Sequence, residues 1–296
     1  DDHFYFVEMA WHLAISCGRR TILDEEIDGM RVLERLTMAF NVPRVRDGRE
    51  LVWCDDRYRG VSFGFTDIVV HTGELLFCSV LRFRAAVQLA EMHQICGAVH
   101  EAERYRSLAA NISEQISSAF MLDSGLLRAS TGKSAQPDVW GSAFAVYSGV
   151  LGREEVRVAQ ALTRALKNGT ITWKGNIRHV PIDGDFNHTS AWEQTVNDWP
   201  KNRYQNGAYW NTPTGWVCYA VAGIDEGAAG ELALQYIEEL REGDFRQGDA
   251  FGSPYECIHP DGAHQQNPVY LTSVTAPVAV FQKLGWIIDN ARNESP

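Results

Sequence analysis

Apolar residues recur at helical spacing along most of the chain, in segments of two kinds. Three segments, 141–150, 215–223 and 273–281, are rich in small apolar residues and carry no charged side chain. Two others, 153–168 and 225–243, have one apolar stripe and one charged face. A helix that is apolar all round is buried on every side, whereas an amphipathic helix lies at the surface. The alternation of the two kinds predicts an inner ring of helices wrapped by an outer ring, connected as successive αα-hairpins.

The same periodicity predicts further helices over about 4–14, 22–40, 76–97 and 105–120. We therefore predict an all-α fold of about nine or ten helices, in which residues 1–296 form a single domain. A closed toroid of six hairpins needs twelve helices, so either an N-terminal hairpin is missing or further helices lie in the loops. The chain opens on "DDHFYFVEMAW", a helical pattern without an initiator Met, which suggests that it begins inside a longer parent sequence.

Three long loops, 40–70, 167–210 and 243–269, each come before a predicted inner helix. Short connections join inner helices to outer ones, so the long loops are expected to gather at one end of the ring. Loops on a rigid scaffold are where binding and catalytic groups concentrate. Functional side chains are therefore expected in these three loops.

The second long loop and the residues after it are unusually aromatic, ending in "RYQNGAYWNTPTGW" at 203–216. Its large aromatic residues are Trp173, Trp192, Trp199, Tyr204, Tyr209, Trp210 and Trp216. Side-chain amides and hydroxyls are interleaved with these rings. A sugar has apolar C–H faces that stack on indole and a polar rim that needs hydrogen-bonding groups, so this composition suits carbohydrate. Two alternatives stay open: a loop packed on its own core, and a rigid protein interface.

Composition limits the remaining classes of function. The net charge is −11 and there is no run of Lys or Arg, so nucleic acid is not an expected partner. No apolar run approaches the roughly 18 residues that span a bilayer, so no membrane association is expected. The cysteines show no CxxC spacing, and those in apolar helical patterns (Cys17, Cys78, Cys96 and Cys218) are expected to be buried free thiols.

Two carboxylates in the loops can perform acid–base chemistry. Asp67 ends "GVSFGFTD" and Glu256 lies in "GSPYECIHPDG". Hydrolysis of a glycosidic bond needs one carboxylic acid that protonates the leaving oxygen and one carboxylate that activates water, and a separation of roughly 6.5–9.5 Å gives inversion. Asp67 has a second interpretation, as a carboxylate that favours the N-terminus of the following helix. His259 and His264 have a metal-like spacing, but their Gly- and Pro-rich loop does not complete a ligand shell, so no metal is predicted.

Several short motifs resemble the six-hairpin glycosidases with an (α/α)6 barrel, in particular the trehalase, processing α-glucosidase and glycogen-debranching groups. "GFTD" before the helix at 72–97 is similar to the segment that carries the acid in those families. "PYECIHPDG" before "LTSVTAPVAVF" is similar to the segment that carries the base. "YQNGAYW" looks like the loops that line the sugar subsite, and "DVWGSAFAVYSGVL" like an inner helix.

The resemblance implies an inverting glycosidase acting on an oligosaccharide or glycoside, with Asp67 as general acid and Glu256 as general base. It implies that Trp140, Asn206, Tyr209 and Trp210 hold the sugar, with Trp192 and Glu193 in second rank and no organic cofactor or catalytic metal. Asp67 is followed by "IVV" where the family has Asp, so Asp138 and Glu193 are further candidates for the acid.

Two other functions remain open. A sugar epimerase or lyase on the same scaffold would use histidines facing the ring axis, which are His71, His179, His188, His259 and His264. A non-catalytic carbohydrate-binding domain would keep the fold without the chemistry.

Overall fold

A computed structural model describes residues 2–57, 67–244, 246, 252–262 and 265–287. The chain divides into two compact units. Unit 1 comprises residues 1–121, 128–135 and 150–152, and unit 2 comprises residues 122–127, 136–149 and 153–296.

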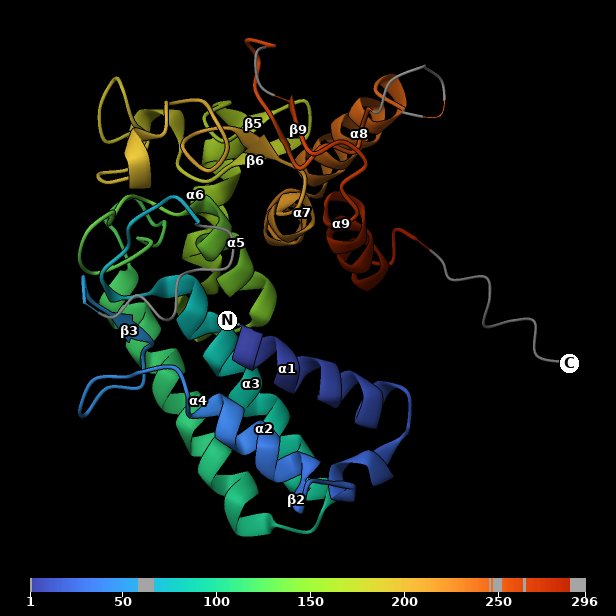
Figure 1. The fold of residues 1–296 in the computed structure, drawn as a ribbon. Helices are drawn as coiled ribbons and strands as arrows, with labels where there is room; N and C mark the ends of the chain where they lie inside the picture. Colours follow the sequence, from blue (N-terminus) through green and yellow to red (C-terminus); the bar gives the residue numbers. More distant parts are fainter. Residues whose placement is uncertain (1, 58–66, 245, 247–251, 263–264, 288–296) are drawn as a thin grey trace, which may run out of the picture. The chain divides into compact units, whose positions relative to one another are not determined.

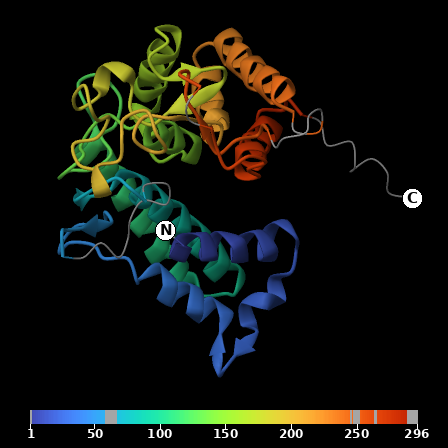
Figure 2. The ribbon, with the colours of Figure 1, turned by 45° about the horizontal axis from the view of Figure 1, so that its top comes forward.

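Unit 1 is built around one long buried helix. Its helices are α1 (Asp2–Trp11), α2 (Val32–Phe40), α3 (Leu76–Ile95) and α4 (Val99–Phe120). Helix α3 contacts each of the other three, and α1 and α2 also contact each other (Figure 2). The ring of Phe40 packs edge-on against both Phe4 and Tyr105, which joins α1, α2 and α4 in one core. The unit therefore has one largely buried helix, α3, packed against the other three.

Short elements connect the helices of unit 1. A π-helical turn (His12–Ser16), a 3-10 helix (Arg20–Asp24) and the hairpin β1–β2 (Glu26–Ile27 and Met30–Arg31) lie between α1 and α2. A second antiparallel pair, β3–β4 (Trp53–Cys54 and Gly73–Glu74), precedes α3. The segment that starts at Asp67 runs directly into strand β4.

Unit 2 shows the predicted buried helices near 141–150 and 215–223 and the predicted outer helices, whereas the segment 273–281, predicted to be buried on every side, leaves Thr275 and Ala279 exposed. Its helices are α5 (Val139–Ser148), α6 (Glu155–Lys167), α7 (Thr214–Ala222), α8 (Glu226–Glu242) and α9 (Thr272–Lys283). The nearly wholly buried α7 contacts α5 on one side and α9 on the other, while α6 and α8 cover this row (Figure 1). Gly215 permits the close approach of α7 and α9, since a Cβ there would lie 2.9 Å from the backbone of Pro277.

The long loops of unit 2 form a five-stranded antiparallel sheet in the order β5-β6-β7-β8-β9. The strands are Thr172–Trp173, Asn176–Arg178, Tyr209–Trp210, Cys257–Ile258 and Gln265–Gln266. Three 3-10 turns, Gly152–Glu154, Ile182–Gly184 and Val196–Asp198, complete the irregular segments. The predicted all-α class therefore holds for the nine helices of the described residues and is incomplete for the loops. Strands of two or three residues are too short to show the alternation that identifies a strand in a sequence.

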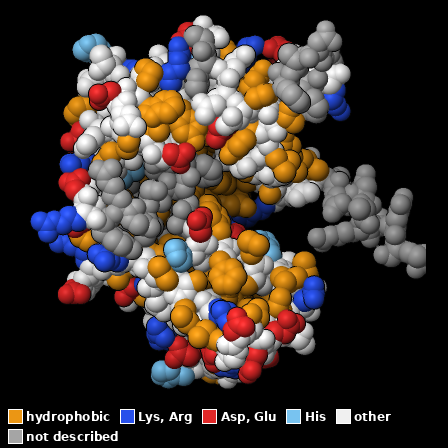
Figure 3. Space-filling view, viewed as in Figure 1, with side chains coloured by type: hydrophobic (Ala, Val, Ile, Leu, Met, Phe, Trp, Pro, Cys, Tyr) orange, Lys and Arg blue, Asp and Glu red, His pale blue; other side chains and the backbone are white. Residues whose placement is uncertain are grey.

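Charged side chains of both signs are interspersed with hydrophobic ones on the face drawn in Figure 3. Over the described ranges, none of the helices combines the length and the apolar character that crossing a bilayer requires. Cys78 and Cys218 are buried thiols as predicted, and Cys96 is half-buried. The prediction is wrong for Cys17, which is exposed beyond the end of α1.

Candidate active site

The sheet of unit 2 brings the aromatic loop and the Glu256 loop together. Tyr209 lies opposite Arg178 of β6 and opposite Ile258 of β8. Residues that oppose each other in an antiparallel pair share one face of the sheet, and alternate residues of a strand share a face. Tyr209 and Ile258 therefore lie on one face, and the period of two extends this face to Glu256. Segments far apart in the sequence thus meet in one small surface.

The opposite face of the sheet is part of the core. Ile177 pairs with Trp210, and Cys257 follows the same alternation on the neighbouring strand. All three side chains are fully buried. Burial of this face fixes the register, because a slip of one residue would exchange the two faces. Tyr209 and Glu256 therefore lie on the other face of the sheet, where both side chains are also nearly buried.

Glu256 is anchored through its side chain and its backbone. Its carboxylate accepts a hydrogen bond of 2.5 Å from the side-chain amide of Asn267, and its N–H bonds to the carbonyls of Gln266 and Asn267. The two preceding carbonyls, of Pro254 and Tyr255, accept from the Tyr270 N–H and the Ser273 hydroxyl. These bonds join the loop to the start of α9. Only 6% of the Glu256 surface is exposed, so the carboxylate has a defined position.

Aromatic rings surround Tyr209. Its ring lies 6.5 Å from that of Trp173 and 6.0 Å from that of His259, between centroids. Burial raises the pKa of the Tyr209 phenol above its ordinary value and lowers the pKa of the His259 imidazole. Both groups are therefore neutral near pH 7 and can act as hydrogen-bonding groups.

A second aromatic cluster lies at the start of α5. The indole of Trp140 stacks on the imidazole of His179, and Trp210 packs edge-on against the same indole with centroids 5.4 Å apart. Asp138 is the N-cap of α5, as predicted, and its carboxylate accepts a 2.8 Å bond from the Gly141 N–H. Burial lowers the pKa of His179, opposed by the Asp138 carboxylate at 4.0 Å.

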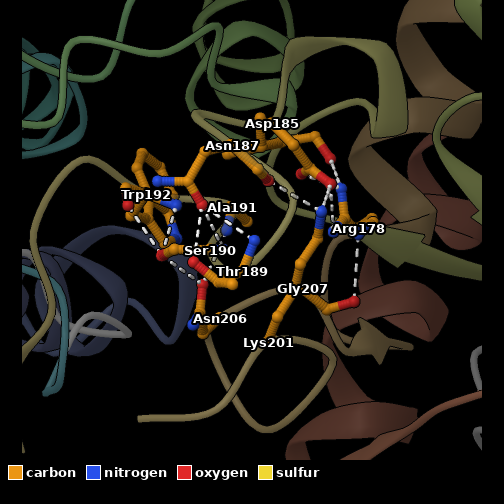
Figure 4. Close-up of polar contacts among 11 residues, drawn as sticks. Arg178, Asp185, Asn187, Thr189, Ser190, Ala191, Trp192, Lys201, Asn206 and Gly207 are labelled. Carbon is orange, nitrogen blue, oxygen red and sulfur yellow. Dashed lines mark hydrogen bonds and ion pairs between the residues drawn. The ribbon is translucent and has the colours of Figure 1, made fainter. Parts of the chain in front are cut away.

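A buried arginine holds the aromatic loop, as Figure 4 shows. The Arg178 guanidinium, 2% exposed, pairs with both oxygens of Asp185 at 2.6 and 3.2 Å. It also donates to the carbonyls of Gly207 at 3.0 Å and Val180 at 2.9 Å. Lys201 forms a second ion pair with Asp185 at 2.6 Å. Arg178 is not among the predicted site residues, because a single Arg in a short strand gives no signal of the loop that it holds.

The amide of Asn206 holds the loop from inside. Its oxygen accepts from the Ala191 N–H at 2.9 Å and from the Ser190 hydroxyl at 3.1 Å, and its NH2 group donates to the Trp199 carbonyl (Figure 4). The indole N–H of Trp192 donates to the Gln205 carbonyl at 2.9 Å. The polar groups that suggested sugar binding therefore bond within the loop.

The predicted sugar-binding residues fall into two groups. The first group has some exposed surface: Glu193 is exposed, and Tyr209, which shares a sheet face with Glu256, is 7% exposed. The others, Trp140, Trp192, Asn206 and Trp210, are each at most 1% exposed and contact other protein groups. Contact of any of these residues with a sugar stays a prediction.

Asp67 belongs to unit 1 and is exposed. The segment that follows it is fixed, because Ile68, Val69 and Val70 are buried and the Thr72 hydroxyl accepts from the Lys133 N–H at 2.8 Å. Helix α3 begins only at Leu76, so the interpretation of Asp67 as a group at the N-terminus of that helix is wrong. Glu256 belongs to unit 2, so the pairing of these two carboxylates stays a prediction. Residues 58–66 and His264 lie outside the described residues.

Comparison with known proteins identifies similarity of fold. No protein-family model matches the chain, and the curated proteins contain no match either. A solved structure described as "Sialidase" matches 84% of this chain at 13% identity, with a TM-score of 0.54. The chain shares this structure's fold. It spans 23% of the length of that protein. The likeness supports the resemblance to six-hairpin glycosidases at the level of fold.

A GH63 mannosylglycerate hydrolase from Thermus thermophilus is a weaker match. Its complex with glucose matches 70% of this chain and 44% of its own, at 11% identity and a TM-score of 0.47. Its complex with Tris gives 12% identity and a TM-score of 0.42 over 70% of this chain and 45% of its own. Because these TM-scores are low, the shared fold rests on the first match. Over the described ranges, no group of three or more His, Cys, Asp and Glu residues could hold a metal ion.

Proposed function

We propose that this chain is the catalytic part of a glycoside hydrolase, in which Glu256 is the general base and Asp67 the general acid. The observation that supports the proposal is the position of Glu256, a nearly buried carboxylate on the same sheet face as the aromatic Tyr209. An acidic group beside an aromatic surface is the combination that cleavage of a glycoside needs. The shared fold with the structure described as "Sialidase" agrees with it.

The proposed reaction is a single displacement with inversion. Glu256 removes a proton from a water molecule while that water attacks the anomeric carbon, and Asp67 donates a proton to the leaving oxygen. The two carboxyl groups must then converge, at a separation of roughly 6.5–9.5 Å, across one end of an (α/α)6 toroid. The proposal assigns no step to a metal or an organic cofactor.

The proposed substrate is an oligosaccharide or a glycoside. Tyr209 provides a ring surface on the sheet face of Glu256, and we expect Trp140, Asn206 and Trp210 to hold the sugar with it. Trp192 and Glu193 contribute at the edge of the same loop. The name of the first matched structure, a sialidase, also indicates a sugar substrate.

A screen of aryl glycosides with the full chain tests the proposal. Asp67→Asn and Glu256→Gln are each expected to lower kcat by about 10²–10⁴-fold, because each removes a group that transfers a proton in the transition state. Asp47→Asn and Glu238→Gln are matched controls, since both residues are exposed and outside the site, and they should retain full activity. NMR of the first product anomer distinguishes inversion from retention.

Two outcomes would contradict the proposal. Full turnover by Glu256→Gln, together with loss of activity in His179→Gln or His259→Gln, would support an epimerase or lyase. Saturable sugar binding without turnover of any glycoside would support a carbohydrate-binding domain.

A further inference from the structure

Asn267 and Glu256 are joined through both side chain and backbone. The Asn267 Nδ2 donates to Glu256 Oε2 at 2.5 Å, and the Glu256 N–H bonds to the Asn267 carbonyl at 3.1 Å. Cys257 pairs with Gln266 in the β8–β9 ladder, so Glu256 and Asn267 are the next opposed positions. Opposed residues share a face, which directs the amide of Asn267 toward the carboxylate.

The backbone at Asn267 also selects the residue type. Its φ is +46°, a left-handed conformation that Asn tolerates better than most residues other than Gly. The side chain must in addition supply an N–H group at this distance. Gly satisfies the first requirement without the second, and a larger apolar residue satisfies neither.

We infer that Asn267 is the positioning residue for Glu256, and that its amide holds the carboxylate ionised and fixes its direction. This inference rests on the proposed function. A general base must be ionised to accept a proton from water, and a hydrogen bond donated to a carboxylate favours its charged form. Asn has no charge, so it orients Glu256 without supplying a second titrating group. Asn267 is exposed, which places the pair where water has access.

Other titratable and charged groups lie on the segment of Glu256 and on the neighbouring strands. They are Tyr255, Cys257, His259 and Asp261 of its own segment, and Arg178 and Tyr209 of β6 and β7. Asp261 pairs with Arg203 at 3.0 Å and with His259 at 3.2 Å. Burial raises the pKa of the Cys257 thiol, so it is uncharged near pH 7. Asn267 donates to the Glu256 carboxylate without titrating itself.

The test compares Asn267→Gly with Asn202→Gly. Asn202 also has a left-handed backbone, with φ of +68°, and belongs to the same unit, so it controls for the loss of a left-handed Asn. Two quantities are measured, the pH profile of kcat/KM and the 13C NMR titration of the Glu256 carboxyl. The Glu256 signal is assigned by its absence in Glu256→Gln.

Asn267→Gly is expected to move the acidic limb of the profile and the Glu256 titration upward by about one pH unit, with KM within about twofold of the wild type. Asn202→Gly should move neither. Identical Glu256 titrations in the wild type and Asn267→Gly would overturn the inference. Full turnover by Glu256→Gln would instead overturn the proposed function, while the NMR titration still tests the contact of Asn267 with Glu256.

Discussion

The indole of Trp140 stacks on the imidazole of His179, with ring centroids 3.5 Å apart and planes 18° apart. His179 is 1% exposed, and burial lowers its pKa below the ordinary value of 6.5. Between the two pKa values the unfolded chain binds a proton that the folded chain does not. The free energy of unfolding therefore rises with pH across this interval.

We expect the contribution of His179 to the free energy of unfolding to be complete above about pH 6.5 and to decrease as the pH falls below that value. His179→Leu should reduce the difference in the free energy of unfolding between pH 7.5 and pH 5.5. Urea denaturation followed by Trp fluorescence measures it. His93 and His259 also have lowered pKa values and remain in both proteins. An unchanged difference in both His179→Leu and His179→Gln would contradict the prediction.

Gly207 cannot accept a side chain. Its φ is +105°, and a Cβ there would lie 2.5 Å from Nη2 of the buried Arg178. Gly207→Ala should lower the free energy of unfolding by about 1–3 kcal/mol, through backbone strain and displacement of the guanidinium. Gly230→Ala is the control, because Gly230 lies in α8 with open space around its Cβ position. It should stabilise the protein by about 0.5–1 kcal/mol. A stability of Gly207→Ala equal to that of the wild type would disprove the steric argument.

The inner and outer helices of unit 2 could be predicted because their residues face only two environments. Segment 215–223 is apolar all round and becomes α7, and segment 225–243 has one apolar stripe and becomes α8. Spacing alone also indicates that Asp138 is an N-cap, since it directly precedes an apolar run. These features depend on residues that are neighbours in the sequence.

The sheet and the contacts of the candidate site could not be predicted in the same way. Tyr209 meets Ile258 through a pairing of strands two residues long, across 48 intervening positions in the chain. Asn206 has the composition of a ligand-binding residue, but its amide bonds to Ala191, Ser190 and Trp199. Whether a polar group faces a ligand or its own loop depends on long-range geometry. The contacts of Arg178 with the aromatic loop also depend on this long-range geometry, so the sequence did not indicate them.

The buried ion pair of Arg178 and Asp185 is expected to contribute to the stability of the protein. Arg178→Met leaves Asp185 with Lys201 as its remaining cation and removes the donor from the carbonyls of Gly207 and Val180. The free energy of unfolding should fall by about 3–5 kcal/mol, which is the usual loss when one partner of a buried pair is removed. The double variant Arg178→Met/Asp185→Asn should recover part of this loss, because it no longer leaves a buried carboxylate without the guanidinium. The prediction would be contradicted if the double variant lost more free energy of unfolding than the two single variants lose together.

Glu239 of the outer helix α8 joins the two loops that carry Tyr209 and Glu256. Its carboxylate, 8% exposed, accepts from the Asn211 amide at 3.1 Å and from the Ser253 hydroxyl at 2.5 Å. Glu239→Leu removes both acceptors and should lower the free energy of unfolding by about 1–3 kcal/mol for each buried donor left unpaired. Glu239→Gln keeps one acceptor oxygen, and its amide can donate to the Ser253 hydroxyl, so its loss should be less than half as large.

The exposed neighbour Glu238 is the matched control for this prediction, and Glu238→Leu should stay within about 0.5 kcal/mol of the wild type. Because Ser253 lies three residues before Glu256, Glu239→Leu should also lower kcat under conditions where the variant is fully folded. Glu239→Gln should restore most of that activity. Urea denaturation and turnover of an aryl glycoside are the two measurements. If Glu239→Leu and Glu238→Leu lose the same stability and activity, then Glu239 does not join the loops.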